Sequence, residues 1–194
     1  MPVPQIILAS SSLYRQQLLE RLGLSFRVVS PNIDESARAG ESPAAMVERL
    51  ALAKAHAVAQ QQHGALVIGA DQVAVHAGEI VGKPRDHEQA RRQLRQASGN
   101  SVTLYTGLAL VNSDNGHSQS DVIPFRVVFR QLSEQQIDHY LQREQPYDCA
   151  GAVKAEGLGI ALLRRLEGDD PSALIGLPLI RLVQMLEHEG VHVV

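Results

Sequence analysis

Two short, almost wholly apolar runs, at residues 5–9 and 65–69, constrain the fold of this chain more than any other feature. Neither run alternates between apolar and polar residues, which is typical of a strand that is buried on both faces. Such a strand belongs in a sheet that helices cover on both sides. The two runs therefore predict an α/β protein whose central strands lie inside the core.

The rest of the sequence alternates helical and extended patterns around these two runs. Capping residues such as Ser42 and Asp86, and a capping box that begins at Ser133, mark helix starts. A turn at 114–116 joins two long extended segments. This order predicts a mixed central sheet flanked by helices. Helices are expected at 13–22, from 43 to beyond 57, at 87–97, 134–143 and 178–189, and further strands at 26–29, 73–75, 101–111 and 117–129.

Composition and charge argue against several classes of protein. The 194 residues carry 18 Lys and Arg against 21 Asp and Glu, whereas a protein that coats nucleic acid or an anionic membrane needs a basic surface. Neither a membrane span nor a signal peptide is expected from the distribution of apolar and basic residues. Cys149 is the only cysteine in the sequence, which favours a reducing cytoplasm. Without repeats or linkers, residues 1–194 are expected to form a single domain.

A hydroxyl-rich turn after the first strand is a candidate anion site. Ser10, Ser11 and Ser12 separate that strand from the next helix, and Arg15 lies about one turn into the helix. Backbone N–H groups, the helix dipole, serine oxygens and a guanidinium together favour a bound anion. A serine cap followed by a solvated arginine explains the same residues equally well.

Asp71 is the strongest single candidate for chemistry. It is expected directly after a buried strand, where an ionised carboxylate is costly unless a metal, a cation or water compensates it. Lys54 is expected at the edge of an apolar helical face, with its stem packed on apolar surface. Glu35 lies in a polar loop, Lys83 between a glycine and a proline, and Glu156 in a turn-like stretch. Each of these three is also explained as an ordinary surface residue.

One familiar motif is expected to be misleading. His188, Glu189 and His192 match the H-E-x-x-H pattern of zinc proteases, which requires a helix that places both histidines on one face. Gly190 interrupts that helix. We therefore expect no metal site at these residues.

Several short motifs occur in a fixed order along almost the whole chain. They are Leu8–Arg15, Asp34–Glu35, Glu41–Pro43 with Lys54, Gly69–Gln72, Gly82–Pro84, Tyr105–Gly107, Ala150–Gly151, Glu156–Gly157 and Gly176–Pro178. This pattern resembles the Maf family of nucleoside triphosphate pyrophosphatases. It is most similar to the branch that acts on 7-methyl-GTP, rather than to the branch that acts on dTTP and UTP. One departure is Leu13–Arg15, where Maf sequences often carry Pro-Arg-Arg or Pro-Trp-Arg.

The resemblance implies a two-lobed fold with a central cleft, related to the inosine-triphosphate pyrophosphatase architecture. It implies hydrolysis of the bond between the α- and β-phosphates, which gives a nucleoside monophosphate and diphosphate. By position, the residues that match the family's active-site set include Asp71 as the proton acceptor. The full set is Ser10, Arg15, Glu35, Lys54, Asp71 and Lys83.

The resemblance also implies roles for these side chains. Ser10, Arg15, Lys54 and Lys83 would bind phosphate oxygens. Lys54 and Lys83 would also act in catalysis, together with Glu35 and Asp71. The two carboxylates would hold a divalent cation, Mg²⁺ or Mn²⁺, because hard cations prefer oxygen ligands. The sequence does not separate the base from the metal ligand.

Three further positions look like those that distinguish the 7-methyl-GTP branch. N7-methylation places a positive charge on the guanine ring, which favours an aromatic face and a carboxylate at the ring edge. Tyr14 offers the face, and Glu156 could accept hydrogen bonds from the guanine N1–H and N2 amine. Gln72 offers both a donor and an acceptor.

The expected partner is a small-molecule nucleoside triphosphate, with no nucleic acid and no membrane. A homodimer is compatible with the sequence, which leaves the oligomeric state open. Two other functions also fit the resemblance. One is the same chemistry on dTTP and UTP, and the other is a non-catalytic nucleotide-binding regulator of cell division.

Overall fold

The computed structural model describes residues 4–194, which divide into two compact units. The first unit comprises the residues up to Gln72 together with Thr106–Ile123 and Asp170–Val194. The second unit comprises Val73–Tyr105 and Pro124–Asp169. The expectation of a single domain with a cleft between two lobes stays a prediction.

The strands form one mixed sheet. Within residues 4–194, seven strands pair in the order β2-β1-β3-β5-β6-β7, with β4 paired to β3. β1 is parallel to β2 and β3, whereas β4 is antiparallel to β3, and β7 is antiparallel to β6. The mixed α/β prediction is therefore confirmed. The strands are β1 (Gln5–Ala9), β2 (Phe26–Val29), β3 (Ala65–His76), β4 (Glu79–Val81), β5 (Ser101–Asn112), β6 (Ser118–Phe129) and β7 (Leu163–Glu167).

Most helices begin where the sequence supplies a cap. The side chains of Ser12, Ser42, Asp86 and Ser133 each accept a hydrogen bond from a backbone N–H in the first turn of their helix. The α-helices are α1 (Leu13–Glu20), α2 (Pro43–Ala59), α3 (His87–Ala97), α4 (Glu134–Glu144), α5 (Pro171–Ile175) and α6 (Leu179–His188), and the short 3₁₀ helices are η1 (Ala150–Ala152) and η2 (Leu158–Leu162). Among the described residues, no helix is long and apolar enough to cross a membrane.

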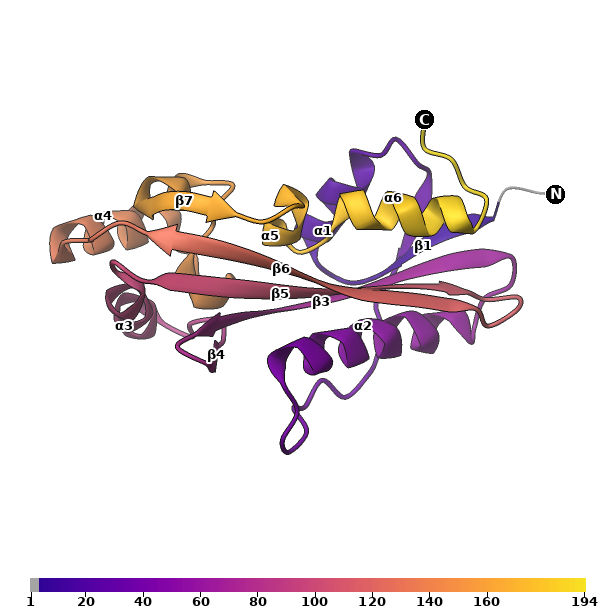
Figure 1. The fold of residues 1–194 in the computed structure, drawn as a ribbon, viewed down its shortest axis with the longest axis horizontal. Helices are drawn as coiled ribbons and strands as arrows, with labels where there is room; N and C mark the ends of the chain where they lie inside the picture. Colours follow the sequence, from indigo (N-terminus) through magenta and orange to yellow (C-terminus); the bar gives the residue numbers. More distant parts are fainter. Residues whose placement is uncertain (1–3) are drawn as a thin grey trace. The chain divides into compact units, whose positions relative to one another are not determined.

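In the first unit, helices cover both faces of the central strands (Figure 1). Ile6 and Leu8 of β1 pack in one apolar cluster with residues of α1 and α6. Ile7 and Ala9 point to the opposite face and pack in a second cluster with residues of α2. Because successive side chains of a strand point to opposite faces, an apolar strand of this kind is buried on both sides. The prediction from residues 5–9 is confirmed.

Two glycines allow α2 to lie directly against the sheet. A Cβ atom at Gly69 of β3 would come within 2.1 Å of the Ala51 carbonyl oxygen, and one at Gly107 of β5 within 2.2 Å of the Val47 carbonyl oxygen. No side chain fits at such distances, so glycine is required at both positions. This close approach carries the buried face of α2 onto β3, where the candidate active site lies.

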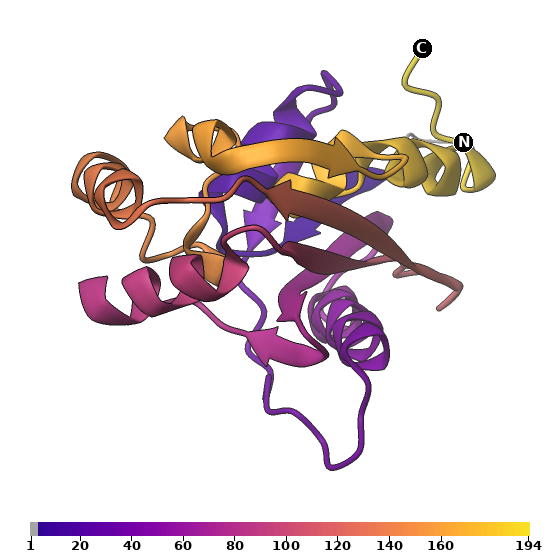
Figure 2. The ribbon, with the colours of Figure 1, turned by 60° about the vertical axis from the view of Figure 1, so that its left-hand side comes forward.

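In the second unit, α3 packs against α4 (Figure 2). Charged pairs link the two helices, since Arg91 Nε lies 2.8 Å from Asp138 Oδ1 and Arg95 Nη2 lies 2.7 Å from Glu134 Oε2.

Five short elements were not predicted from the sequence: β4, β7, α5 and the two 3₁₀ helices. They are short, and short segments carry too little periodicity to be recognised.

Candidate active site

Asp71 lies inside a strand rather than at its end. β3 runs without a break from Ala65 to His76, so the expectation that the strand stops before Asp71 is wrong. Residues 73–75 continue the strand, and Asp71 is only 8% exposed. A carboxylate inside a sheet needs a partner that compensates for the loss of water.

Lys54 supplies that partner from the buried face of α2. Its Nζ atom lies 2.7 Å from Asp71 Oδ1 and 3.1 Å from Glu35 Oε1. The side chains of Lys54 and Asp71 are nearly buried, whereas that of Glu35, on the loop between β2 and α2, is 57% exposed. One ammonium group therefore joins a helix, a strand and a loop of the first unit.

The position of Lys54 on its helix corrects the sequence prediction. It lies among the buried residues of α2, next to Ala55, rather than at the edge of the apolar face. The apolar pattern could not show this, because a lysine is not normally buried without a partner. The partner is Asp71, which lies 17 positions further along the chain.

The serine turn forms a compact cap at the start of α1. Ser12 is the N-cap residue, and its hydroxyl accepts a hydrogen bond from the Arg15 backbone N–H. The Ser12 N–H donates in turn to Ser10 Oγ over 3.1 Å, and Ser10 is buried. The cap is confirmed, and it places the Arg15 side chain on the first turn of the helix.

The Arg15 side chain is half-buried and anchored at one nitrogen. Its Nε donates to the Gly176 carbonyl oxygen over 2.9 Å, and among residues 4–194 this is its only side-chain hydrogen bond. Burial lowers the pKa of the Arg15 guanidinium, while the negative charges of Asp71 and Glu35 oppose that shift. Arg15 thus shares the electrostatic environment of Asp71, and its two terminal nitrogens make no hydrogen bond among residues 4–194.

Gln72 contacts β5 and helix α5. Its Nε2 donates to Thr106 Oγ1 over 2.9 Å and to the Ala173 carbonyl oxygen over 2.7 Å, with Leu174 at 3.3 Å. The Thr106 hydroxyl donates to the same Ala173 oxygen. The donors expected to face a base are therefore used within the first unit. The Gln72 Oε1 atom is the part of this side chain left for a ligand.

The other predicted residues lie at the surface or partly buried. Tyr14 is half-buried on α1 of the first unit. Lys83, in the loop after β4, and Glu156, in the turn before η2, are exposed residues of the second unit. The parts that Tyr14, Lys83 and Glu156 play in a site stay predictions.

The carboxylates fit a divalent cation that also binds phosphate. Among residues 4–194, no group of three or more His, Cys, Asp or Glu could hold a metal ion alone. However, Glu35 and Asp71 both reach one cation, the Lys54 ammonium, and both offer oxygen atoms. Mg²⁺ is commonly held by one or two carboxylates together with substrate phosphates. The two residues suit that arrangement rather than a complete protein cage.

The H-E-x-x-H motif has a structural explanation. α6 ends at His188, and Gly190 adopts a positive φ of 79°, as expected for a helix break. Glu189 accepts hydrogen bonds from Asn112 and His117 of the β5–β6 hairpin. Burial raises the pKa of Glu189, but these hydrogen bonds lower it overall. The glutamate fastens the end of α6 within the first unit.

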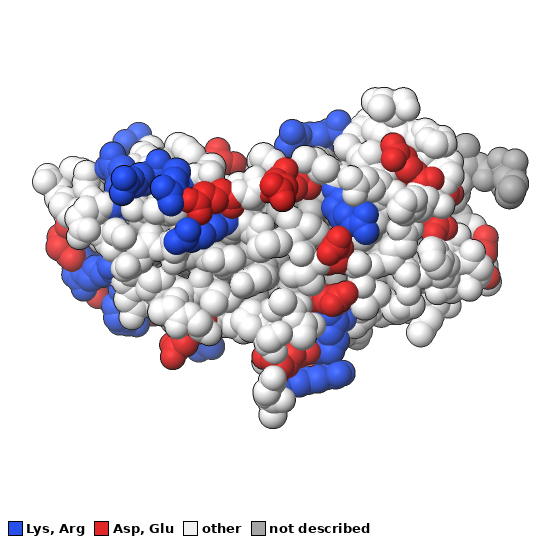
Figure 3. Space-filling view, viewed as in Figure 1, with Lys and Arg blue, Asp and Glu red and all other residues white. Residues whose placement is uncertain are grey.

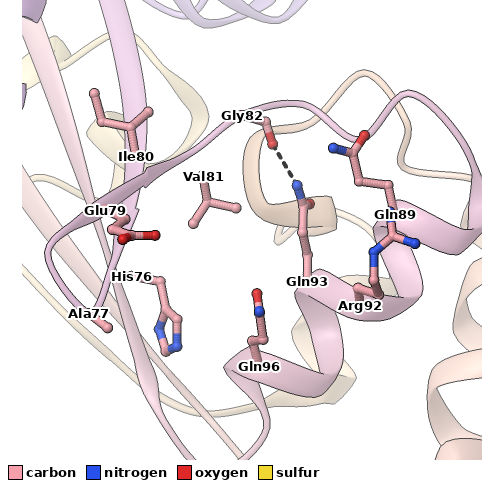
Figure 4. A pocket seen from close by; sticks show the side chains of 10 residues that line it. All are labelled: His76, Ala77, Glu79, Ile80, Val81, Gly82, Gln89, Arg92, Gln93 and Gln96. Carbon is pink, nitrogen blue, oxygen red and sulfur yellow. Dashed lines mark hydrogen bonds between the residues drawn. The ribbon is translucent and has the colours of Figure 1, made fainter.

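A hollow of about 480 Å³ lies in the second unit beside β4 and α3 (Figure 4). Figure 4 shows Gln93 donating through Nε2 to the Gly82 carbonyl oxygen, over 3.1 Å. The residues that line the hollow include none of those predicted for the site. They are His76, Ala77, Glu79, Ile80, Val81, Gly82, Gln89, Arg92, Gln93 and Gln96.

On the face shown in Figure 3, basic side chains gather at one end with acidic side chains beside them. In the second unit, Arg126 pairs with Glu167 at 2.9 Å, and Arg165 pairs with the same carboxylate. Part of the positive charge near β7 is therefore neutralised within the unit.

One buried acid of the first unit, Asp170, was not predicted from the sequence. Asp170 caps α5, and its other oxygen accepts from the Ile180 N–H of α6 over 2.8 Å. It is 4% exposed, so these hydrogen bonds compensate for its burial. The sequence does contain a signal for a helix start here, because an acid is a common N-cap residue and proline favours the first position of a helix.

Fold and site together define a mixed α/β protein with buried cationic and acidic groups around one strand. The model of the Maf family, described as Maf-like protein, matches residues 5–189, and this chain belongs to that family. The resemblance found in the sequence is confirmed.

Two relatives are similar over nearly their whole length. A protein of Nitrosococcus oceani named 7-methyl-GTP pyrophosphatase is 58% identical over 187 residues, which cover 96% of this chain and 94% of the relative. A Pseudomonas syringae pv. tomato protein with the same name is 56% identical over 191 residues, which cover 98% of this chain and 100% of the relative. Among solved structures, a HAM1 protein from Coxiella burnetii is 17% identical with a TM-score of 0.47, covering 66% of this chain and 74% of that one.

Proposed function

We propose that this protein hydrolyses 7-methyl-GTP to 7-methyl-GMP and diphosphate. The structural observation that carries the proposal is the buried pair of Lys54 and Asp71, joined by Glu35. Two relatives more than half identical to this chain, and matched over nearly their full length, bear the name of this activity. The protein is thus a hydrolase that acts on an acid anhydride.

The cations of the first unit suit the phosphate chain of the substrate. Arg15 presents two terminal nitrogens, in a fork that matches the oxygens of a phosphate group. Lys54 adds an ammonium group, and Ser10 a hydroxyl beside the N-terminus of α1. Lys83 of the second unit is proposed to bind the outer phosphates or the bridging oxygen.

Asp71 is proposed to accept the proton of the attacking water. Lys54 contacts Oδ1, and among residues 4–194 no hydrogen bond is made by Oδ2, which can therefore face a water molecule. The water oxygen forms a bond to the α-phosphorus while the bond from that phosphorus to the α–β bridging oxygen breaks. The bridging oxygen keeps the electron pair and leaves as part of diphosphate.

A divalent cation, Mg²⁺ or Mn²⁺, is proposed to bind at Glu35 and Asp71. When bound, such a cation would neutralise charge on the phosphate oxygens. Glu35 is the more exposed of the two carboxylates and suits a ligand that arrives together with the nucleotide.

The methylated base is proposed to be recognised by Tyr14, Gln72 and Glu156. Tyr14 offers an aromatic face to a positively charged ring, and Glu156 offers a carboxylate to the base edge. The Gln72 Nε2 atom already donates to Thr106 and α5, so only Oε1 is proposed to bind the base. Tyrosine has a smaller ring than the tryptophan common in this branch, and we expect it to stack less strongly.

A panel of nucleoside triphosphates tests the function directly. Purified protein is incubated with 7-methyl-GTP, GTP, dTTP and UTP, with and without Mg²⁺ or Mn²⁺, and diphosphate is measured. We expect the highest kcat/KM for 7-methyl-GTP, and only when metal is present. Preference for dTTP and UTP would assign the chain to the pyrimidine activity. Nucleotide binding without diphosphate release would instead support a non-catalytic regulator.

We further propose that residues 1–194 act as a single domain on free nucleotides in the cytoplasm. The family match over residues 5–189 supports one functional region. The net charge of −3 and the paired arginines near β7 argue against a nucleic-acid surface. A homodimer is compatible with this role and is tested by light scattering.

A further inference from the structure

Glu35 is held in place although it lies on an irregular loop and makes a single ion pair. It lies in the segment of residues 30–42 between β2 and α2, which contains no helix or strand. Figure 2 shows this segment as a long violet loop that leads into α2. The one ion pair of Glu35 among residues 4–194 is with Lys54 at 3.1 Å. A half-exposed side chain on such a loop loses conformational entropy when it is held in place.

Arg49 of α2 binds the loop at two points, the backbone of Ser36 and the side chain of Glu41. Arg49 donates from Nε to Glu41 Oε1 over 2.6 Å and from Nη2 to Glu41 Oε2 over 2.7 Å. The same Nη2 donates to the Ser36 carbonyl oxygen over 3.1 Å. Ser36 directly follows Glu35, so a single guanidinium reaches the end of the loop and the backbone beside Glu35.

Further hydrogen bonds stiffen the loop around these two points. Asp34 Oδ1 accepts from both the N–H and the hydroxyl of Ser36, over 2.9 and 2.6 Å, and so closes a turn around Glu35. The Arg38 N–H donates to Glu41 Oε2 over 3.2 Å. We refer to the paired side chains of Arg49 and Glu41 as the Arg49–Glu41 clamp. These side chains are 19% and 10% exposed, so the clamp is shielded from most of the solvent.

The clamp stays charged across the pH range in which the protein would work. The hydrogen bonds from Arg49 lower the pKa of Glu41 to about 2. The same carboxylate raises the pKa of Arg49. A bidentate pair of this kind fixes orientation as well as distance, which a lysine at the same position could not do.

We infer that Arg49 is a positioning residue that holds Glu35 against Lys54 and so sets the affinity of the site for its divalent cation. The inference rests on the proposed function for its cation, but the order of the loop can be measured without any activity. Arg49 lies on the same helix as Lys54, so one rigid element fixes both the ammonium and the loop that carries the acid.

Amide hydrogen exchange of residues 30–42, measured without nucleotide or metal, tests the positioning. We expect Arg49→Ala and Glu41→Gln to speed exchange in this segment by about 10-fold or more, because one clamp is lost. Arg49→Lys keeps the charge but not the fork, and we expect it to resemble Arg49→Ala. Arg38→Ala is the matched control, since it removes a charge from the same loop and keeps the backbone N–H. Wild-type exchange in Arg49→Ala, or in Arg49→Lys, would overturn the inference.

The Mn²⁺ dependence of diphosphate release gives the second measurement. We expect the Mn²⁺ concentration at half-maximal rate to rise about 10–100-fold in Arg49→Ala, as for other residues that orient a metal ligand, with a smaller change in kcat. A lower melting temperature with unchanged Mn²⁺ half-saturation would show a merely structural role and contradict the inference. If the wild type releases no diphosphate from 7-methyl-GTP, the proposed function fails while the exchange result still decides the clamp.

Discussion

The two units differ in how they hold the residues predicted for the site. In the first unit, Lys54 contacts both Asp71 and Glu35, and Arg15 donates a hydrogen bond to the Gly176 carbonyl oxygen. In the second unit, Lys83 and Glu156 are exposed, and no hydrogen bond or ion pair joins either side chain to another of residues 4–194. The predicted residues of the first unit are thus held by protein contacts, whereas the side chains of Lys83 and Glu156 in the second unit are not.

Substitutions in the two units should differ in their effect on the free energy of unfolding. Removing one partner of a buried ion pair leaves an uncompensated charge and lowers stability, so substitutions in the first unit should affect stability as well as the proposed activity. Exposed, unpaired groups contribute little to stability, so their loss should affect substrate alone. Substitutions in the two units should therefore separate into two classes of result.

The largest effect is expected for Asp71→Asn in the first unit. The substitution keeps the shape and removes the proton acceptor, so kcat for 7-methyl-GTP should fall about 10²–10⁴-fold while nucleotide binding is largely kept. Stopped assays of diphosphate release and calorimetric titration measure the two quantities. Turnover near the wild-type rate would reject Asp71 as the base.

Control substitutions for Asp71→Asn lie outside the proposed site. Asp169→Asn makes the same change at an exposed acid and should leave kcat unchanged. His188→Ala and His192→Ala test the zinc-protease motif and should also keep full activity. Loss of activity in either histidine variant would show that these histidines serve the activity.

Lys54→Met should give the largest change in stability. It leaves the buried Asp71 carboxylate without its cation, and breaking a buried pair costs about 3–5 kcal/mol. Asp71→Asn should cost less, because Glu35 remains as a partner of Lys54. Urea unfolding of both variants measures the free energies. A more stable Lys54→Met protein would mean that the pair is not needed for the fold.

Lys83→Ala probes the second unit and should weaken binding without loss of stability. We expect binding of the triphosphate to fall about 10-fold and binding of the monophosphate to change less, because the lost charge faces the outer phosphates. The melting temperature should stay at the wild-type value. Equal weakening for mono- and triphosphate, measured by calorimetry, would place Lys83 elsewhere.

Glu156→Gln should change selectivity rather than catalytic power. Loss of one charge-assisted contact to the base should lower kcat/KM for 7-methyl-GTP relative to UTP by about 10-fold. Glu88→Gln, in α3 of the same unit, is a matched control. An unchanged ratio would remove Glu156 from base recognition and leave the phosphate chemistry intact.

The smallest effect is the pH dependence of the Arg49–Glu41 clamp. Because the pKa of Glu41 falls from about 4.5 to about 2 on folding, its ionised form stabilises the native state above pH 4.5. That contribution is lost as the pH falls towards 2. The difference in melting temperature between wild type and Glu41→Gln should thus shrink below pH 4.5. A difference that grows with acidity would contradict the assigned shift.

The sequence predicted the architecture well because its signals are local. The apolar runs at residues 5–9 and 65–69 and the caps at Asp86 and Ser133 depend only on near neighbours. The structure confirms each of them. The resemblance to the Maf family assigned Lys54 and Asp71 to one site, and their side chains are in contact, while their roles in catalysis stay a prediction.

What the sequence could not predict depends on contacts between distant segments. Asp71 interrupts an apolar pattern, which predicts a strand end there, but β3 continues to His76 and the ion pair with Lys54 compensates for the burial of the carboxylate. Arg49 and Glu41 look like ordinary surface charges until the loop between β2 and α2 is folded back. The spacing of polar residues does not show which of them pair in space.

Hydrolysis of 7-methyl-GTP in ¹⁸O-labelled water tests the central claim most directly. Water activated by Asp71 is proposed to attack the α-phosphorus, so the label should appear in 7-methyl-GMP and not in diphosphate. In Asp71→Asn the labelled product should form only at a residual rate. Label in diphosphate, or release of single phosphate groups, would contradict attack at the α-phosphorus and with it the assigned site.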